Sequence, residues 1–493
     1  MELTVTILPQ GKKLTARDGS LLLDILRKYD LAPDAPCAGT GNCGKCTVIV
    51  DGEAVRSCRF VVTKDVTVSL SEKDAKTRIL EEGFGADTDM QPWNAGHMLA
   101  YDIGTTTVVC YLLEENTGKQ LASASTVNPQ QSFGADVISR IRSARDGERE
   151  NLTNLIRAKM AELMQTVCMD AKITPAAIGT VSVVGNPCMQ QLFLGMDVEN
   201  LAQIPFAPAL TDKAVVDAAA YLPECWNAKL LIVPDIAGFV GADTVGCVLA
   251  TDLDRQEEIT LLVDIGTNGE LVLGNRHRMA ACATAAGPAL EGACIRFGMR
   301  AAAGAIDHVW MEDGALRCSV IGGGKAVGIC GSGLIDAVAV LVETGLVNRR
   351  GRLASHLREA EGQRVFDLID GVYLTQEDIR QVQMAKSAIA AGIHLMADHL
   401  NIKVADIQQV LLAGAFGSFI HAENACRMGL LPKELAGKIR AVGNAAGSGA
   451  RRLACSKQEL DRAQEIVEKT EFLELASLRA FPRCFAKNME FER

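Results

Sequence analysis

Short apolar segments alternate with polar turns over the first 70 residues, and they predict a small domain of strands with one helix. Residues 3–9 and 12–16 (LTVTILP and KKLTA) alternate apolar and polar positions, as the two strands of a β-hairpin do. Residues 20–29 (SLLLDILRKY) carry apolar side chains at helical spacing, and residues 66–70 (VTVSL) predict a last strand. We therefore expect an α+β domain at the N-terminus.

The pattern changes after this domain. Residues 71–98 lose the apolar period and gain charged residues, glycine and proline, which is typical of a linker. From residue 99 to the C-terminus, strand-like apolar runs alternate with helical patterns, which indicates an α/β architecture. We expect the first domain to cover residues 1–72 and the linker to cover residues 73–98.

Four cysteines in the first domain have the spacing of iron-sulfur ligands. Five residues separate Cys37 from Cys43, two separate Cys43 from Cys46, and eleven separate Cys46 from Cys58. A 2Fe-2S cluster needs four thiolates, and three of them come here from one glycine-rich loop, PCAGTGNCGKC. Glycines in such a loop allow positive φ angles and leave backbone N–H groups for the cluster sulfurs. The sequence therefore predicts a 2Fe-2S cluster and electron transfer.

Two other uses of these cysteines fit less well. Zinc sites usually bring two close cysteine pairs, whereas this segment has one, Cys43 and Cys46. A disulfide needs an oxidising compartment, and the N-terminal residues MELTVTILPQGKK do not read as a secretory signal. The spacing and its surroundings resemble the ferredoxin domains of the β-grasp fold.

Composition excludes several function classes. The chain has 493 residues, of which 48% are hydrophobic and 22% charged, and its net charge is −10. Binding to nucleic acid or to an anionic membrane needs clustered Lys and Arg, and the sequence has no basic stripe. Its apolar runs are shorter than the about 20 residues that cross a bilayer. We therefore expect a cytoplasmic protein that binds neither nucleic acid nor membrane.

The sixteen cysteines are an unusual number for such a chain. The twelve outside the cluster motif contain no CxxC pair, and we expect most of them to be small core residues. Free thiols in this number suit an anaerobic or strongly reducing cytoplasm.

Two segments of the α/β part repeat one motif. Residues 99–121 and 261–279 each read as a strand, a tight turn and a second strand, and in each the first strand runs into Asp-Ile-Gly-Thr. Glycine lets the backbone approach a phosphate, and the following hydroxyl and N–H groups face its oxygens. The motif residues that we expect at phosphate are Gly104, Thr105, Thr106, Gly266, Thr267 and Asn268.

A third glycine-rich segment, residues 410–425, follows a helical pattern at residues 383–400. Its small residues, among them Gly414 and Gly417, would let a nucleotide base and ribose lie against the backbone. Taken alone, the segment is equally well explained as a helix N-terminus packed closely on a sheet.

The order of these segments resembles the superfamily of actin, sugar kinases and heat-shock chaperone ATPases. Residues 234–250 (PDIAGFVGADTVGCVLA) are similar to the helix that links the two lobes of that fold. The resemblance implies two ribonuclease-H-like lobes, a first lobe with the linking helix at residues 99–250 and a second lobe at residues 251–493, closing on ATP and magnesium.

With a ferredoxin domain in front, the whole chain resembles the reductive activators of corrinoid proteins. The segments that carry this resemblance are ACATAAGPALEGACIRFGMRAAAGAIDHV, GICGSGLIDAV and LLAGAFGSF. The resemblance implies ATP-dependent reduction of a corrinoid methyl carrier of a methyltransferase system from Co(II) to Co(I), with electrons from a low-potential donor. It is also compatible with a homodimer.

Residue roles follow from this resemblance. Asp102 and Asp264 would hold magnesium, through waters, and orient the attacking water. Gly414 and Gly417 would line the adenosine. Gly331, Ser332 and Gly333 open a helical pattern and could present N–H groups to phosphate, although a packing turn explains them equally well. We expect Glu291 to be a surface carboxylate rather than a base or a magnesium-water ligand.

Three other functions remain as alternatives. A redox-sensing kinase shares the ATPase fold, but the predicted interlobe segments are small and apolar and lack groups for sugar hydroxyls. An activator of a radical dehydratase or aryl-CoA reductase also shares it, but those activators bridge one cluster between two subunits. A plain electron carrier would not need the two motif aspartates.

Overall fold

The computed structural model of the protein describes residues 2–8, 11–29, 31–33, 46–70, 89–266, 268–417 and 419–491. Three predictions fall outside these residues: the cluster ligands Cys37 and Cys43, most of the linker, and Thr267 of the second phosphate motif. Among the helices within the described ranges, none combines the length and apolar character needed to span a lipid bilayer.

The N-terminal domain has the predicted strands and helix. Its strands and helix are β1 (Glu2–Leu8), β2 (Lys12–Arg17), β3 (Ser20–Leu21), α1 (Leu22–Lys28), β4 (Thr47–Val50), β5 (Glu53–Arg56), β6 (Val61–Val62) and β7 (Val66–Ser69). The main sheet has the order β2-β1-β7-β4-β5, with β1 antiparallel to β2 and parallel to β7. The predicted hairpin, helix and last strand are therefore confirmed. The helix begins two residues later than its pattern, because Ser20 and Leu21 pair with β6.

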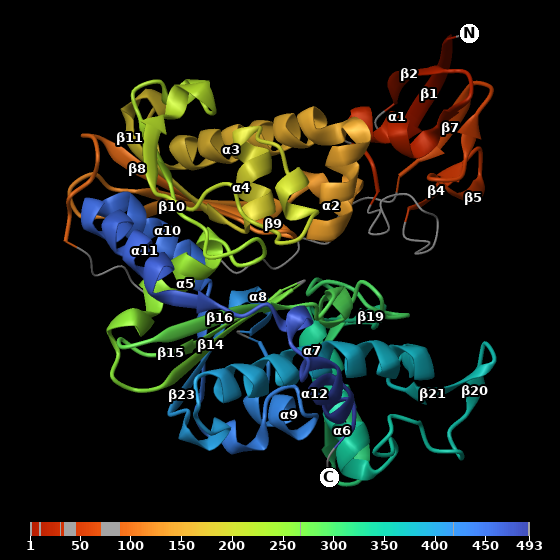
Figure 1. The fold of residues 1–493 in the computed structure, drawn as a ribbon. Coiled ribbons are helices and arrows are strands. Elements are labelled where there is room, and N and C mark those ends of the chain that lie inside the picture. The colour runs from red at the N-terminus through yellow and green to blue at the C-terminus, as the bar shows by residue number, and fades with distance from the viewer. Residues whose placement is uncertain are drawn as a thin grey trace.

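Two larger lobes follow, each built on a six-stranded sheet (Figure 1). The strands and helices of the first lobe are β8 (His97–Ile103), β9 (Thr107–Leu113), β10 (Gln120–Val127), α2 (Val137–Ser143), α3 (Arg149–Ala171), β11 (Ile178–Gly185), α4 (Pro187–Leu194), β12 (Ala214–Asp217), β13 (Lys229–Ile232) and α5 (Ala242–Thr251). Those of the second lobe are β14 (Thr260–Ile265), β15 (Gly269–Gly274), β16 (Met279–Thr284), β17 (Ala305–Glu312), β18 (Ala315–Val320), β19 (Gly328–Ile329), α6 (Gly331–Thr344), β20 (Glu359–Ala360), β21 (Gln363–Asp367), β22 (Tyr373–Thr375), α7 (Gln376–His399), β23 (Gln409–Ala413), α8 (Gly414–Gly417), α9 (Ala422–Arg427), β24 (Ile439–Gly443), α10 (Ala445–Cys455), α11 (Lys457–Lys469), β25 (Thr470–Phe472) and α12 (Phe481–Asn488).

The two sheets have the same internal order. In the first lobe β10, β9 and β8 are antiparallel neighbours, and β8 continues into the parallel strands β11 and β13. In the second lobe β16, β15 and β14 correspond to them, followed by the parallel strands β23 and β24. The repeated strand-turn-strand motif therefore marks a duplicated sheet, as the sequence predicts.

Helices α5 and α10 lie between the two sheets (Figure 1). One apolar cluster joins Val184 of the first sheet and Leu411 of the second to Val248 of α5 and Leu453 of α10. The two helices cross at Gly449 of α10, where an added Cβ would lie 2.1 Å from the carbonyl oxygen of Gly246. The linking helix is shorter than predicted, because residues 234–241 form turns and only Ala242–Thr251 is helical.

Most of the scattered cysteines are core residues, as predicted. Of the twelve outside the cluster motif, nine are buried, two are half-buried, and Cys294 is exposed. In the first lobe, for example, Cys188 of α4 has no exposed surface and belongs to the apolar cluster that also contains Val183 and Met189.

Candidate functional site

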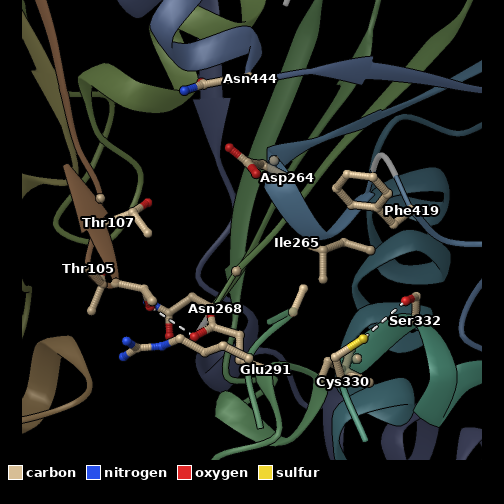
Figure 2. Close-up of a pocket in the computed structure, with 18 of the residues that line it drawn as sticks. Thr105, Thr107, Asp264, Ile265, Asn268, Glu291, Cys330, Ser332, Phe419 and Asn444 are labelled. Carbon is tan, nitrogen blue, oxygen red and sulfur yellow. Dashed lines mark hydrogen bonds between the residues drawn. The ribbon is translucent and has the colours of Figure 1, made fainter. Parts of the chain in front are cut away.

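A pocket between the lobes collects most of the predicted nucleotide residues. Ten of the thirteen line it: Asp102, Gly104, Thr105, Thr106, Asp264, Gly266, Asn268, Gly331, Ser332 and Gly414. Figure 2 shows Thr105 and Thr107 of the first lobe on one side, and Asp264, Phe419 and Ser332 of the second lobe across from them.

Two predicted glycines do not line the pocket. Gly333 packs α6 onto β17, since an added Cβ would lie 2.4 Å from the carbonyl oxygen of Ile306. Gly417 is buried against Leu412 of β23. For Gly333 the packing explanation is therefore the better one.

A tight turn follows each motif strand, and the second turn closes one residue earlier than the first. In the first lobe, the chain leaves β8 after Ile103, and the N–H of Gly104 donates to the carbonyl of Thr107 at 2.9 Å. In the second lobe, the N–H of Gly266 donates to the carbonyl of Asn268, also at 2.9 Å. Asp102 and Asp264 are the penultimate residues of β8 and β14, so both side chains reach the pocket from the same position of their sheets.

Side chains behind the first turn fix its shape. Asn128 Nδ2 donates to the carbonyl of Gly104 at 2.8 Å, and Gln131 Nε2 donates to that of Thr106 at 3.3 Å. The buried guanidinium of Arg140 donates to the carbonyl of Thr105, and burial lowers the pKa of Arg140 to about 10. The carbonyl oxygens of the turn therefore face the interior of the first lobe.

Six carboxylates line the pocket, and four of them, from Asp102, Asp243, Asp264 and Glu270, interact through their charges. Burial raises the pKa of Asp102 to about 7, against the hydrogen bond from Asn444 and with a smaller contribution from the charge of Asp264. Burial first and then Asp264 raise the pKa of Asp243 to about 7. The pKa values of Asp264 and Glu270 are also raised, chiefly by burial. A pocket this rich in acidic oxygens favours a cation.

Both interlobe helices begin at this pocket. Asp243 stands in the first turn of α5, and Asn444 caps α10 by accepting from the N–H of Gly447 at 2.7 Å. The amide of Asn444 also donates to Asp102 Oδ2 at 2.8 Å, while the thiol of Cys247 in α5 lies 3.5 Å from Asp264 Oδ2. Each motif aspartate is therefore held by one of the helices that join the lobes.

The prediction for Glu291 is wrong. This carboxylate lines the pocket from the second lobe and accepts a hydrogen bond from the hydroxyl of Thr106 at 2.9 Å (Figure 2). It sits at the end of a short 3-10 helix, Pro288–Glu291, which turns its side chain toward the first lobe. The contact bridges the lobes directly.

Other pocket residues have weak signals in the sequence. Asp243 lies within the segment similar to a linking helix, and Glu270 follows the second motif by two residues. Asn444 follows a strand and precedes the small residues of AAGSGA, which resembles the strand-to-glycine pattern of the third segment. Without the fold, nothing marks these three as neighbours.

A 3-10 helix connects the three parts of the chain. This helix, η1 (Pro129–Phe133), contacts the N-terminal domain through Arg27. The Nε of Arg27 donates to the carbonyl of Ser132 at 2.6 Å. The guanidinium also lies 5.0 Å from the ring centre of Phe133. Gln131 of the same helix holds the first phosphate turn and accepts from Arg300 of the second lobe.

In the N-terminal domain, the structure describes two of the four cluster cysteines. The side chains of Cys46 and Cys58 are 1% and 4% exposed. Ser57 holds their two segments together, because its N–H and its hydroxyl both donate to the carbonyl of Cys46, at 3.0 and 2.9 Å. Two buried thiols next to an undescribed glycine-rich segment fit a sulfur-ligated cluster.

Three family models match the chain in order. The 2Fe-2S iron-sulfur cluster binding domain matches residues 5–72, the RACo middle region matches residues 97–256, and the C-terminal ASKHA domain of RACo matches residues 258–493. These matches cover the N-terminal domain and both lobes.

Known proteins share the architecture over most of its length. The chain is 31% identical to the corrinoid activation enzyme RamQ of Eubacterium limosum, with 96% of each protein covered. It is 28% identical to the [Co(II) methylated amine-specific corrinoid protein] reductase of Methanosarcina barkeri, over 80% of this chain and 76% of that protein. A solved reductive activator for corrinoid, iron-sulfur protein superposes with a TM-score of 0.73 and 27% identity, covering 99% of this chain and 98% of that one. This chain therefore belongs to the family of RACo-type corrinoid activation enzymes, in which an N-terminal 2Fe-2S ferredoxin domain precedes a two-lobed ASKHA ATPase.

Proposed function

We propose that this chain returns the corrinoid carrier of a methyltransferase system from Co(II) to Co(I), using an electron from a low-potential donor and the hydrolysis of ATP. The observation that carries this proposal is the pocket, where matching strands of the two lobes each bring in an aspartate, in a chain with a 2Fe-2S domain in front. Asp102 and Asp264 are its catalytic candidates.

Backbone groups from both lobes would hold the nucleotide. Thr105 and Thr106 of the first turn and Gly266 and Asn268 of the second line the pocket from opposite lobes, where N–H groups not used within the turns would donate to phosphate oxygens. The first turn of α6 adds Gly331 and Ser332, and the N-terminus of a helix attracts an anion. Gly414 has φ +84°, and a Cβ there would lie 2.6 Å from Asp264 Oδ1, so only glycine leaves this wall open for the adenosine.

The donor set of the pocket fits Mg²⁺. This ion prefers oxygen ligands and keeps several of its waters. The four clustered carboxylates supply such oxygens, and their raised pKa values show that their negative charges are not compensated by protein groups. When bound, Mg²⁺ would neutralise charge on the phosphates. Asp102 and Asp264 would hold it through waters and orient the attacking water. Asn444 and Cys247 fix the two carboxylates for this task.

The thiols of Cys37, Cys43, Cys46 and Cys58 would hold the 2Fe-2S cluster, which supplies a one-electron carrier when bound. The residues around Cys46 and Cys58 bury the ligands and so keep water from the sulfurs. Ser57, next to Cys58, donates to the carbonyl of Cys46 and so holds the two ligand segments together.

The energy balance explains why an ATPase is attached. Plant-type 2Fe-2S clusters have potentials of roughly −400 mV, and we expect the Co(II)/Co(I) couple of the carrier to lie lower. A gap of about 100–200 mV costs on the order of 2–5 kcal/mol for one electron, since about 59 mV is a factor of ten. ATP can cover this cost only if its states change the contacts with the carrier. Helix η1 offers a route, because it contacts the phosphate turn and the N-terminal domain.

A direct test follows cobalt absorption under anaerobic conditions. Purified protein, a low-potential reductant, Mg-ATP and a Co(II) corrinoid carrier are mixed, with parallel samples that lack ATP or contain a non-hydrolysable analogue. We expect Co(I) to accumulate only with ATP. Formation of Co(I) at the same rate without nucleotide, or its absence when the cluster is reduced and ATP is consumed, would refute the proposal.

A further inference from the structure

Two histidines and a buried aspartate meet in the second lobe, outside the set of carboxylates described above. His308 lies on β17, Asp336 lies in the second turn of α6, and His421 directly precedes α9. Nδ1 of His308 is 3.0 Å from Asp336 Oδ2, and Nδ1 of His421 is 3.1 Å from both carboxylate oxygens. One ligand atom from each residue lies within 4.8 Å of the others.

The carboxylate is buried and fixed. Asp336 is 1% exposed, in a helix whose other buried residues are largely apolar. Asn424 of α9 donates to its Oδ1 at 2.7 Å, and the backbone N–H of Val309 lies 3.4 Å from its Oδ2. A buried carboxylate is costly unless it is neutralised and hydrogen-bonded, so a carboxylate at this position needs a positive partner.

The two imidazole rings are arranged as a pair of ligands. Their centres are 4.4 Å apart, their planes differ by 25°, and both Nδ1 atoms face the same carboxylate. Two imidazolium cations stacked this closely would repel each other. A metal ion between the Nδ1 atoms and the carboxylate would instead neutralise Asp336 while both rings stay uncharged.

The ligand types select the class of metal. Imidazole nitrogen suits zinc and its neighbours among the divalent transition metals, whereas Mg²⁺ and Ca²⁺ prefer an all-oxygen set. Two ligands at about 2.0–2.1 Å from a tetrahedral ion lie about 3.3 Å apart. The distances from the two Nδ1 atoms to the carboxylate oxygens, 3.0 and 3.1 Å, are close to this value. The side chain of His421 is 56% exposed and leaves a path for the ion from solvent.

We propose that His308, Asp336 and His421 bind one zinc-class divalent transition-metal ion, with a fourth position left to water. The three ligands come from three separate elements, so the ion would tie β17, α6 and the start of α9 together. Two of these elements border the nucleotide pocket, since His308 lines it and α6 begins with Gly331 and Ser332 in its wall. The third ligand, His421, follows the pocket residue Phe419 by two positions.

The test measures metal content and affinity in the full chain, purified without oxygen and with its iron quantified in the same samples. After equilibration with buffered free Zn²⁺, wild type should retain one zinc per chain more than the variants His421→Ala and His308→Ala, and their affinity should fall at least 100-fold. The control His277→Ala removes an exposed histidine that pairs with Glu257, and it should retain the zinc. Because all samples share the N-terminal cysteines, zinc bound there cancels in the comparison.

Two further measurements separate binding from folding. Asn424→Ala keeps all three ligands but removes the amide from Asp336, and it should weaken zinc binding by about 10–100-fold. Zinc should raise the Tm of wild type and of His277→Ala, but not that of His421→Ala. Equal zinc affinity in wild type and in the two ligand variants, or no zinc bound by wild type at micromolar free Zn²⁺, would overturn the proposal.

Discussion

At the residue scale, the two motif aspartates have matching positions but different neighbours. Asp102 accepts from the amide of Asn444, whereas Asp264 has the weaker thiol of Cys247 beside it and the backbone of Gly414 close by. A carboxylate with fewer strong donors is freer to bind a hydrated cation and a water. This difference makes Asp264 the sharper target for substitution.

We expect Asp264→Asn to lower the rate of ATP hydrolysis by about 10²-fold or more, the cost of losing the group that orients the attacking water. The amide keeps the shape of the side chain but removes its charge. The visible spectrum of the cluster should stay unchanged, because the cluster cysteines lie in another domain. The matched control Asp313→Asn, in an exposed turn between β17 and β18, should keep full ATP turnover.

The sequence predicts those pocket residues that a repeated motif marks. Asp102 and Asp264 stand out because two copies of one strand-turn-strand pattern place them equivalently. Asp243, Glu270 and Asn444 reach the same pocket from a helix start, a strand and a helix cap, and only the tertiary fold makes them neighbours. The expectation of a surface position for Glu291 fails for the same reason, because its partner Thr106 lies 185 residues earlier in the chain.

At the element scale, the strands and their duplication follow from the apolar pattern, whereas the contact between α5 and α10 does not. Nothing in the sequence around Ala445 indicates that this helix packs against Ala242–Thr251. The two helices approach closely because each has a glycine at the crossing, Gly246 and Gly449. The two lobes are therefore connected by a pair of packed helices, α5 and α10, and not by the linking helix α5 alone.

Gly449→Ala should destabilise the protein, although alanine favours a helix over glycine by about 1 kcal/mol. The new methyl group would lie 2.1 Å from a backbone carbonyl that cannot rotate away, and we expect a net loss of about 1–3 kcal/mol. Thermal unfolding and ATP turnover measure this effect, and we expect a lower Tm and slower turnover.

Gly392→Ala in α7 is the control for this substitution. It adds the same methyl group within a helix, but the methyl meets side-chain atoms of Leu271 and Thr284 at 2.8 Å, which can shift. Its loss of stability should be smaller. If the two variants have equal Tm values, the close backbone contact at the crossing is not the cause of the stability loss in Gly449→Ala.

At the scale of the whole molecule, one arginine joins the redox domain to the ATPase. The hydrogen bond from Arg27 to the carbonyl of Ser132 is charge-assisted, and such bonds contribute about 1.5–3 kcal/mol. Its guanidinium also packs on Phe133, in the same 3-10 helix that supports the first phosphate turn. A shift of the first phosphate turn would therefore move helix η1, which is the part of the ATPase that Arg27 of the N-terminal domain contacts.

We expect Arg27→Ala to raise the rate of amide hydrogen exchange at residues 130–134 and to lower the yield of Co(I) per ATP hydrolysed. ATP turnover and the cluster spectrum should change little, since Arg27 touches neither site. Lys28→Ala, one residue further on α1, removes an exposed cation whose ring contact is with Tyr29 of its own domain. Identical exchange and yield in both variants would show that the arginine contact carries no coupling.

The burial of so many thiols has a consequence for the lifetime of the folded chain. Burial raises the pKa of Cys188 and Cys225 to about 12 and that of Cys168 and Cys455 to about 11, so these groups hold almost no reactive thiolate near neutral pH. Opening of the core would return each to ordinary reactivity at once. Exposure to air should then trap opened molecules in mixed disulfides, so that heat inactivation becomes a one-way process whose half-life depends on dissolved oxygen.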